Sequence, residues 1–159
     1  TGNINYRTLL PIYQYNGDNA LLYGLETFFE SKLIGNFILD GSASYVYGKL
    51  IDSKTPIPMM PPLSAKLGLK YSSGNFNAGV TLQGALKQNR IEEFEMPTAG
   101  FLTGDVFIQY QFVAGSLLHT AVLNVENITD KEYRMHLSRV KSIMPEPGRN
   151  VKLLYMIYF

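Results

Sequence analysis

Asn150-Val151-Lys152-Leu153-Leu154-Tyr155-Met156-Ile157-Tyr158-Phe159 is the stretch that decides the fold. Its odd-numbered residues are all apolar or aromatic, whereas Asn150 and Lys152 stand on the other side. Successive side chains of a strand point to opposite faces, so this stretch predicts a strand with one unbroken apolar face. Strands of transmembrane β-barrels alternate in this way and carry aromatic residues where the strand meets the membrane interface. We therefore expect the terminal Phe159 to lie in an apolar environment such as lipid.

The composition limits the possible classes of protein. A chain of 159 residues suits one domain, and a net charge of +1 gives no electrostatic reason to expect a nucleic acid partner. Cysteine is absent, which excludes disulfides and thiolate metal sites. No run approaches the roughly 20 apolar residues of a membrane helix. The first residues have neither a basic start nor an apolar segment, so they do not resemble a signal peptide. We expect the chain to be a piece of a longer protein.

Alternation with period two recurs along the whole chain, and it favours strands over helices. Six further segments show it, with apolar residues on one face and polar or small residues on the other: 23–29, 37–47, 63–71, 76–86, 102–112 and 119–125. A fragmentary pattern near Ile4 to Leu10 would add an eighth strand. The predicted fold is all-β, an antiparallel up-and-down meander of seven or eight strands.

The connections between these segments alternate in length. Short turns with Gly or Asn, which supply the positive φ of tight hairpins, are predicted at 33–36, 72–75 and 114–116. Long connections lie at 11–19, 50–62, 88–100 and 128–148. Loops of that length are uncommon in compact domains unless they are functional or disordered. Short turns at one rim and long loops at the other are typical of transmembrane barrels.

Aromatic residues on the apolar face fall into two groups, one near each end of the strands. Those near the short-turn rim are Phe29, Phe37, Tyr71, Phe76, Phe112 and Phe159. Tyr23, Tyr45 and Tyr47 lie toward the opposite rim. Aromatic rings favour the boundary between water and lipid, so two such groups indicate a band that crosses a membrane. A soluble ligand-binding β-barrel would also alternate, with the same face turned inward.

Several motifs resemble those of the C-terminal part of a TonB-dependent outer-membrane receptor. They are Gly24-x-Glu26, Pro61-Pro62, Asn127-Ile128-Thr129-Asp130-Lys131-x-Tyr133, Pro147-Gly148-Arg149 and the final Phe159. The resemblance implies that residues 1–159 are the last strands of a barrel of the 22-strand type. It also implies that the plug domain, the TonB box and the earlier strands belong to parts of the receptor that this chain lacks.

The same resemblance implies a location and a set of partners. The location is the outer membrane of a Gram-negative bacterium, and the partners are membrane lipid, TonB, the plug domain and a small ligand. Energy-coupled uptake of a ferric siderophore is the expected function, followed by cobalamin, copper or an oligosaccharide. Fold alone does not name a ligand.

Candidate ligand-binding residues come from the long connections. An acidic run with a neighbouring cation lies in 88–100, and a histidine and an arginine lie in or beside 128–148. The set is Arg90, Glu92, Glu93, Glu95, His136 and Arg149. The alternative is that these charges are simply exposed loop, as most such runs are.

Methionine is concentrated in the same connections, at Met59, Met60, Met96, Met135 and Met144. Thioethers together with an imidazole suit copper, particularly Cu(I), so Met135, His136 and Met144 are a candidate metal site. The alternative is that methionine fills irregular gaps in folded loops.

The sequence shows no enzyme motif and implies no cofactor. Ser, His and Asp are present, but no pattern orders them into a catalytic triad. Besides the receptor and the soluble barrel, one hypothesis stays open: a complete eight-stranded outer-membrane barrel with a structural or adhesive role. Its first and last strands would pair with each other.

Overall fold

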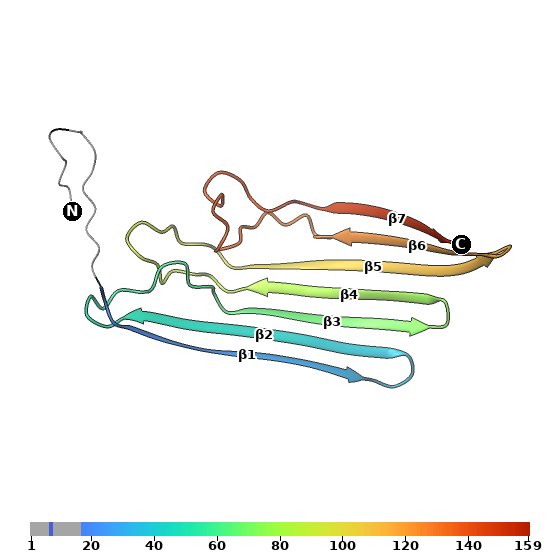
Figure 1. Cartoon of the computed structure of the whole chain (residues 1–159), viewed down its shortest axis with the longest axis horizontal. Helices are drawn as coiled ribbons and strands as arrows, with labels where there is room; N and C mark the ends of the chain where they lie inside the picture. Colours follow the sequence, from blue (N-terminus) through green and yellow to red (C-terminus); the bar gives the residue numbers. More distant parts are fainter. Residues whose placement is uncertain (1–6, 8–16) are drawn as a thin grey trace.

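A computed structural model describes residue 7 and residues 17–159, and the fragmentary strand pattern near Ile4 to Leu10 falls almost wholly outside them. The described residues form one antiparallel sheet of seven strands, each paired with its sequence neighbours (Figure 1). The strands are β1 (Ala20–Lys32), β2 (Phe37–Leu50), β3 (Ser64–Ser73), β4 (Phe76–Ala85), β5 (Phe101–Ala114), β6 (Leu117–Glu126) and β7 (Asn150–Tyr158). The predicted all-β meander is confirmed. In this part of the chain no helix has the length and apolar character needed to cross a bilayer.

Tight turns join the strands at one rim of the sheet, and long connections join them at the other (Figure 1). Gly35, Gly74 and Gly115 occupy the tight turns with φ of +71°, +55° and +64°. Glycine adopts this left-handed region at no steric cost, which explains its place in each hairpin. We call the two ends of the sheet the short-turn rim and the long-loop rim.

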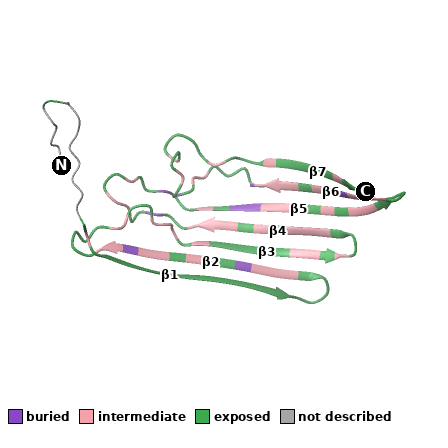
Figure 2. Ribbon diagram, viewed as in Figure 1, coloured by how far each residue is buried: buried purple, intermediate pink, exposed green. Residues whose placement is uncertain are grey.

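The apolar residues of the strands form one exposed face. Leu67, Val80, Ile108 and Leu123 share this face through the strand register, and each is between 37% and 47% exposed. No hydrophobic side chain is buried among the described residues, whereas Thr103, Thr120, Asn127 and His136 are. Figure 2 shows how little of the strands is buried. The apolar residues of the seven described strands therefore form no closed interior.

The opposite face of the sheet is polar and contains several glycines. Lys70 Nζ lies 2.8 Å from Asp40 Oδ1, and Lys152 Nζ lies 2.6 Å from Glu126 Oε1. Gly68 is the cross-strand partner of Asp40, and a Cβ there would lie 2.7 Å from the carboxylate. We call the two sides of the sheet the apolar face and the polar face.

The sheet is open at both edges in the described part of the chain. β1 pairs only with β2, β7 pairs only with β6, and β1 does not pair with β7. Every residue of β1 is exposed (Figure 2). The pairing expected of a complete small barrel is therefore not formed by these seven strands.

Candidate functional site in the long loops

Three long connections, residues 51–63, 86–100 and 127–149, meet at the long-loop rim (Figure 1). Short backbone pairings shape two of them, between Lys49 and Pro56 and between Gln88 and Thr98. Gln88 also donates from Nε2 to the Met60 carbonyl at 2.9 Å, which ties the second connection to the first. The connections therefore form one folded layer and not three separate loops.

His136 links the last connection to the 86–100 connection from a buried position. Only 4% of the residue is exposed. Its Nδ1 lies 2.9 Å from Thr98 Oγ1 and 3.2 Å from Lys141 Nζ, and its Nε2 lies 2.9 Å from Glu95 Oε1. An ammonium group only donates, so Nδ1 accepts and the ring proton sits on Nε2, facing the Glu95 carboxylate. These four side chains, Glu95, Thr98, His136 and Lys141, are called the loop cluster below.

The surroundings of His136 favour its neutral form. Burial lowers its pKa from the ordinary value, and the positive charge of Lys141 lowers the pKa further. The Glu95 carboxylate acts in the opposite direction but does not outweigh these effects. A neutral imidazole can accept from Lys141 through Nδ1, and its Nε2 then lies 2.9 Å from the Glu95 carboxylate without the alignment of a hydrogen bond.

Glu95 is the centre of a second set of contacts in the same layer. Its Oε1 accepts from the Met59 backbone N–H at 3.2 Å, and its Oε2 accepts from the Glu92 N–H at 3.5 Å. Lys141 Nζ donates to the Met96 carbonyl at 2.9 Å. The loop cluster thus joins all three connections, and its polar side-chain atoms contact one another or nearby backbone groups.

The predicted ligand-binding residues are therefore only partly brought together. Glu95 and His136 meet as described. The Glu92 carboxylate accepts from the Phe94 N–H at 3.4 Å, and Glu93 is exposed. Arg149 is also exposed, and its backbone N–H donates to Asp130 Oδ1 at 2.8 Å.

Arg90 lies apart from the loop cluster, against the apolar face. Its guanidinium carbon is 3.8 Å from the centre of the Tyr47 ring, and its Nη2 donates to the Gly48 carbonyl at 3.2 Å. Tyr47 stacks on Tyr23, its cross-strand partner, with ring centres 4.8 Å apart. The sequence placed Arg90 in a loop but carried no signal that its side chain would turn to this face.

The candidate metal ligands differ in their availability. Met135 and Met144 are 44% and 56% exposed, whereas both ring nitrogens of His136 contact neighbouring side chains. Within the described residues no group of three or more His, Cys, Asp or Glu side chains is placed to hold a metal ion. The copper site therefore stays a prediction in which His136 would have to release its present partners.

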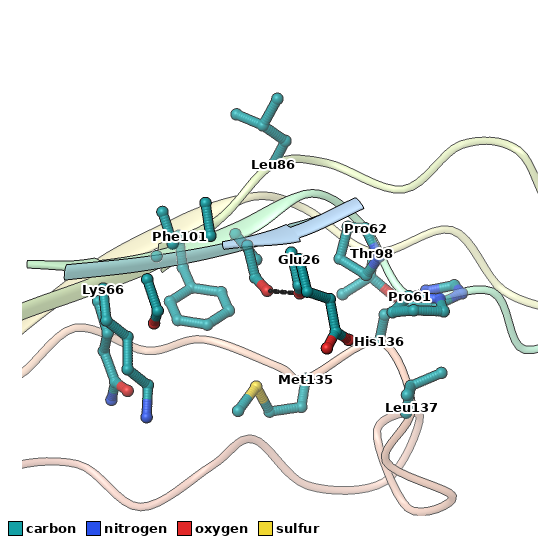
Figure 3. Close-up of a pocket in the computed structure, with 18 of the residues that line it drawn as sticks. Glu26, Pro61, Pro62, Lys66, Leu86, Thr98, Phe101, Met135, His136 and Leu137 are labelled. Carbon is teal, nitrogen blue, oxygen red and sulfur yellow. Dashed lines mark hydrogen bonds between the residues drawn. The ribbon is translucent and has the colours of Figure 1, made fainter. Parts of the chain in front are cut away.

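A cavity of about 800 Å³ lies against the polar face, below the long loops. Glu26, Lys66 and Phe101 line it from the strands, and Met135 and His136 line it from the last connection (Figure 3). This volume lies in the range of small-molecule sites. From the sequence, the alternation of the strands puts Glu26 and Lys66 on the polar face, where we expect some side chains to contact substrate or the plug. Phe101 was not a candidate, and the available signal was its place on the face opposite to Leu102, at the long-loop end of β5.

The residues of the quoted motif hold the base of the last connection. The Asn127 side chain donates to the carbonyls of Lys131 and Pro147, at 2.9 and 3.3 Å, and accepts from the Lys131 N–H at 2.9 Å. Its backbone N–H donates to Asp105 Oδ1 at 2.8 Å. Tyr133 packs on Phe101 with ring centres 4.4 Å apart. The motif thus joins β5, β6 and the start of β7, and we call this arrangement the Asn127 clamp.

The aromatic residues predicted for the membrane interface lie near the short-turn rim of the sheet, and their contact with a membrane stays a prediction. Phe37, Tyr71 and Phe76 follow one another across three strands, with successive ring centres 5.1 and 6.2 Å apart. Phe112 stacks on His119 at 4.9 Å. The two remaining residues are Phe29, whose ring covers Gly41, and Phe159, which is fully exposed at the chain end.

The arrangement of strands, rims and faces agrees with the comparisons to known proteins. The family model described as TonB dependent receptor-like, beta-barrel matches residues 1–128. Among solved structures, the chain is similar to one named copper transporter OprC, with 26% identity and a TM-score of 0.78. That match covers 89% of this chain and 24% of the other, so the chain spans about a quarter of that protein's length. No curated protein matches the chain in sequence. The chain belongs to the TonB-dependent receptor-like β-barrel family and corresponds to part of such a barrel.

Proposed function

We propose that the chain forms the C-terminal strands of an outer-membrane receptor that takes up a scarce, bulky nutrient with energy supplied through TonB. The observation that carries the proposal is the combination of an exposed apolar face with three long connections folded together at one rim. An apolar face suits the hydrocarbon of the membrane, and long loops at the outer rim suit ligand capture. The plug domain and the segment that binds TonB would belong to other parts of the same receptor.

Ferric siderophore is the ligand class that we propose first. The cavity against the polar face would form one wall of the binding chamber, with Lys66 and Arg134 on that wall. Lys66 forms no ion pair with any described residue, which leaves its charge available to an anionic ferric chelate. Arg134 is held 2.7 Å from Glu132, so it contributes less free charge.

Copper is the second candidate, and two observations favour it. The chain is similar to a protein named as a copper transporter. Met59, Met96, Met135 and Met144 are all at least 43% exposed in the long connections. Thioether sulfur is a soft ligand that suits Cu(I).

Growth of a strain that carries or lacks the full-length receptor distinguishes these ligands. With a ferric siderophore as the sole iron source, we expect growth that requires both the receptor and TonB. The Lys66→Gln variant should raise the siderophore concentration needed for half-maximal growth, whereas Lys32→Gln, a cation at the short-turn rim, should not. If only copper accumulation depends on the receptor and falls in a Met135→Leu/Met144→Leu variant, copper replaces siderophore. If neither depends on it, the uptake proposal is wrong.

A further inference from the structure

Arg90 places a fixed positive charge on the apolar face at the long-loop rim. Its guanidinium carbon lies over the Tyr47 ring, 3.8 Å from the ring centre, and its Nη2 donates a hydrogen bond to the Gly48 carbonyl at 3.2 Å. A planar guanidinium carries five N–H donors, so this single bond leaves most of them unused. Arg90 forms no ion pair in the described part of the chain. The charge is thus held in place without a carboxylate to neutralise it.

Lys49 brings a second cation to the same place. It follows Tyr47 by two residues on β2, so both side chains point to the apolar face about 7 Å apart. Lys49 forms no ion pair with a described residue either. Asp52, the carboxylate closest to Lys49 in the sequence, contacts Asn19 through Oδ2. Two unneutralised cations therefore flank one tyrosine ring.

The position of Lys49 and Arg90 along the strands, between the two rims, determines which ligand can reach them. Below it on the apolar face lie Leu25 and Tyr45, opposite each other on β1 and β2, and both are exposed. The stacked pair Tyr23 and Tyr47 comes next, and tyrosine rings favour the boundary between hydrocarbon and head groups. Arg90 lies against Tyr47 at that level, and Lys49 is the next residue of β2 on the same face toward the long-loop rim. An anion that reaches them from the membrane side is a lipid head group.

We propose that Lys49, Arg90 and the Tyr23–Tyr47 pair form a binding site for the phosphate of an outer-leaflet glycolipid. Arginine binds phosphate through two parallel N–H groups, and stacking on an aromatic ring holds its plane ready for this. The acyl chains of the same lipid would lie along the apolar face below the tyrosines. The inference rests on the proposed function in one respect, namely that the apolar face contacts lipid and the long-loop rim faces outward.

Lipid binding by the full-length receptor in detergent tests the site. The probes are bisphosphorylated lipid A, the same lipid without phosphates, and inorganic phosphate alone, measured by native mass spectrometry. We expect the wild type to retain the phosphorylated lipid and the Lys49→Gln/Arg90→Gln variant to bind it about tenfold more weakly, which corresponds to about 1.4 kcal/mol. Arg90→Lys should lose part of the affinity, because a point charge does not replace the two-pronged contact.

Controls separate this site from general effects. Lys32→Gln removes a cation at the other rim on the polar face and should leave lipid binding unchanged. Circular dichroism of each variant shows whether the barrel has folded. Equal binding of the phosphorylated lipid by the wild type and the double variant would overturn the proposal. Inorganic phosphate that displaces the lipid at millimolar concentration would overturn it too, because the site would then serve free phosphate. Uptake by the wild type is a separate measurement, so a receptor that retains lipid but transports nothing contradicts the proposed function and not this site.

Discussion

His136 shows how one buried residue fixes the long loops. Its two ring nitrogens contact Thr98, Lys141 and Glu95, and these partners lie in two different connections. Removing His136 would take one contact from each of these three side chains, and a buried polar group that loses a partner costs free energy. The side chain that the sequence singled out as a candidate ligand therefore holds the loop layer together in this structure.

Replacement of His136 by alanine should loosen the 86–100 connection. The change removes one contact from each of Glu95, Thr98 and Lys141, although Glu95 and Lys141 keep their backbone partners, with a local cost of about 1–3 kcal/mol. Hydrogen exchange of the full-length receptor measures this, and backbone amides such as Thr98 N–H should exchange faster while those of the strands keep their rates. Ser142→Ala, an exposed change in the 127–149 connection that also contains His136, serves as the control. Unchanged exchange at Thr98 would show that the cluster does not hold the loops.

The loop cluster should also respond to pH. Because burial and Lys141 lower the pKa of His136, the unfolded form of the loops binds a proton more readily than the folded form. The stabilisation is therefore present above the ordinary histidine pKa of about 6.5 and is lost as the pH falls below it toward the lower folded value. Hydrogen exchange at Thr98 should accelerate between pH 7 and 5 relative to amides of β3, after correction for intrinsic rates. The His136→Ala variant should not show this change, and an equal response in both proteins would assign the effect to other groups.

At the scale of elements, the Asn127 clamp sets where β7 begins. Asn127 adopts a φ of +49°, a region that asparagine tolerates better than most residues, and its side chain forms three hydrogen bonds to the last connection. Glu126 closes β6 opposite Asn150 of β7, directly beside the clamp. The family motif thus connects the end of β6 with the start of β7.

Two variants at Asn127 separate its hydrogen bonds from its backbone conformation. Asn127→Gly keeps the positive φ but loses the side-chain bonds, with an expected cost of about 1–3 kcal/mol. Asn127→Ala loses the same bonds and adds backbone strain, so it should be less stable than the glycine variant by about 1 kcal/mol. Thermal unfolding of the full-length receptor measures both. Equal stability of the wild type and the glycine variant would mean that the clamp contributes nothing.

The strands were predictable from the sequence, but the contacts between connections were not. Alternation with period two identifies strands such as 150–158 because side-chain direction depends only on neighbouring residues. The contact of Glu95 with His136 joins residues 41 positions apart in segments without periodicity, so no local pattern marks it. Arg90 illustrates the same limit, since its place on Tyr47 depends on how the 86–100 connection folds back over β2.

At the scale of the whole molecule, the described sheet has two unpaired edges and an unusually apolar surface. β1 and β7 each have a single partner strand in the described residues, and large side chains of the apolar face such as Leu25 and Leu153 are 70% and 77% exposed. Unpaired strand edges and extended apolar patches both promote association. In a receptor barrel, neighbouring strands would pair with both edges and lipid would cover the apolar face.

The isolated chain of 159 residues should therefore not remain a monomer in detergent-free buffer. In the monomer, the unpaired backbone N–H and C=O groups of β1 and β7 form hydrogen bonds with water, and pairing with a second copy would replace these by strand hydrogen bonds. Packing of two apolar faces against each other would also remove apolar surface from water. Light scattering coupled to size exclusion should show dimers or larger species whose share grows with concentration. The full-length receptor in detergent, with its strand edges paired within one barrel, is the control and should show no such growth. An open, stable monomer of the isolated chain in plain buffer would mean that the apolar face tolerates water, and the membrane assignment of this face would then fail.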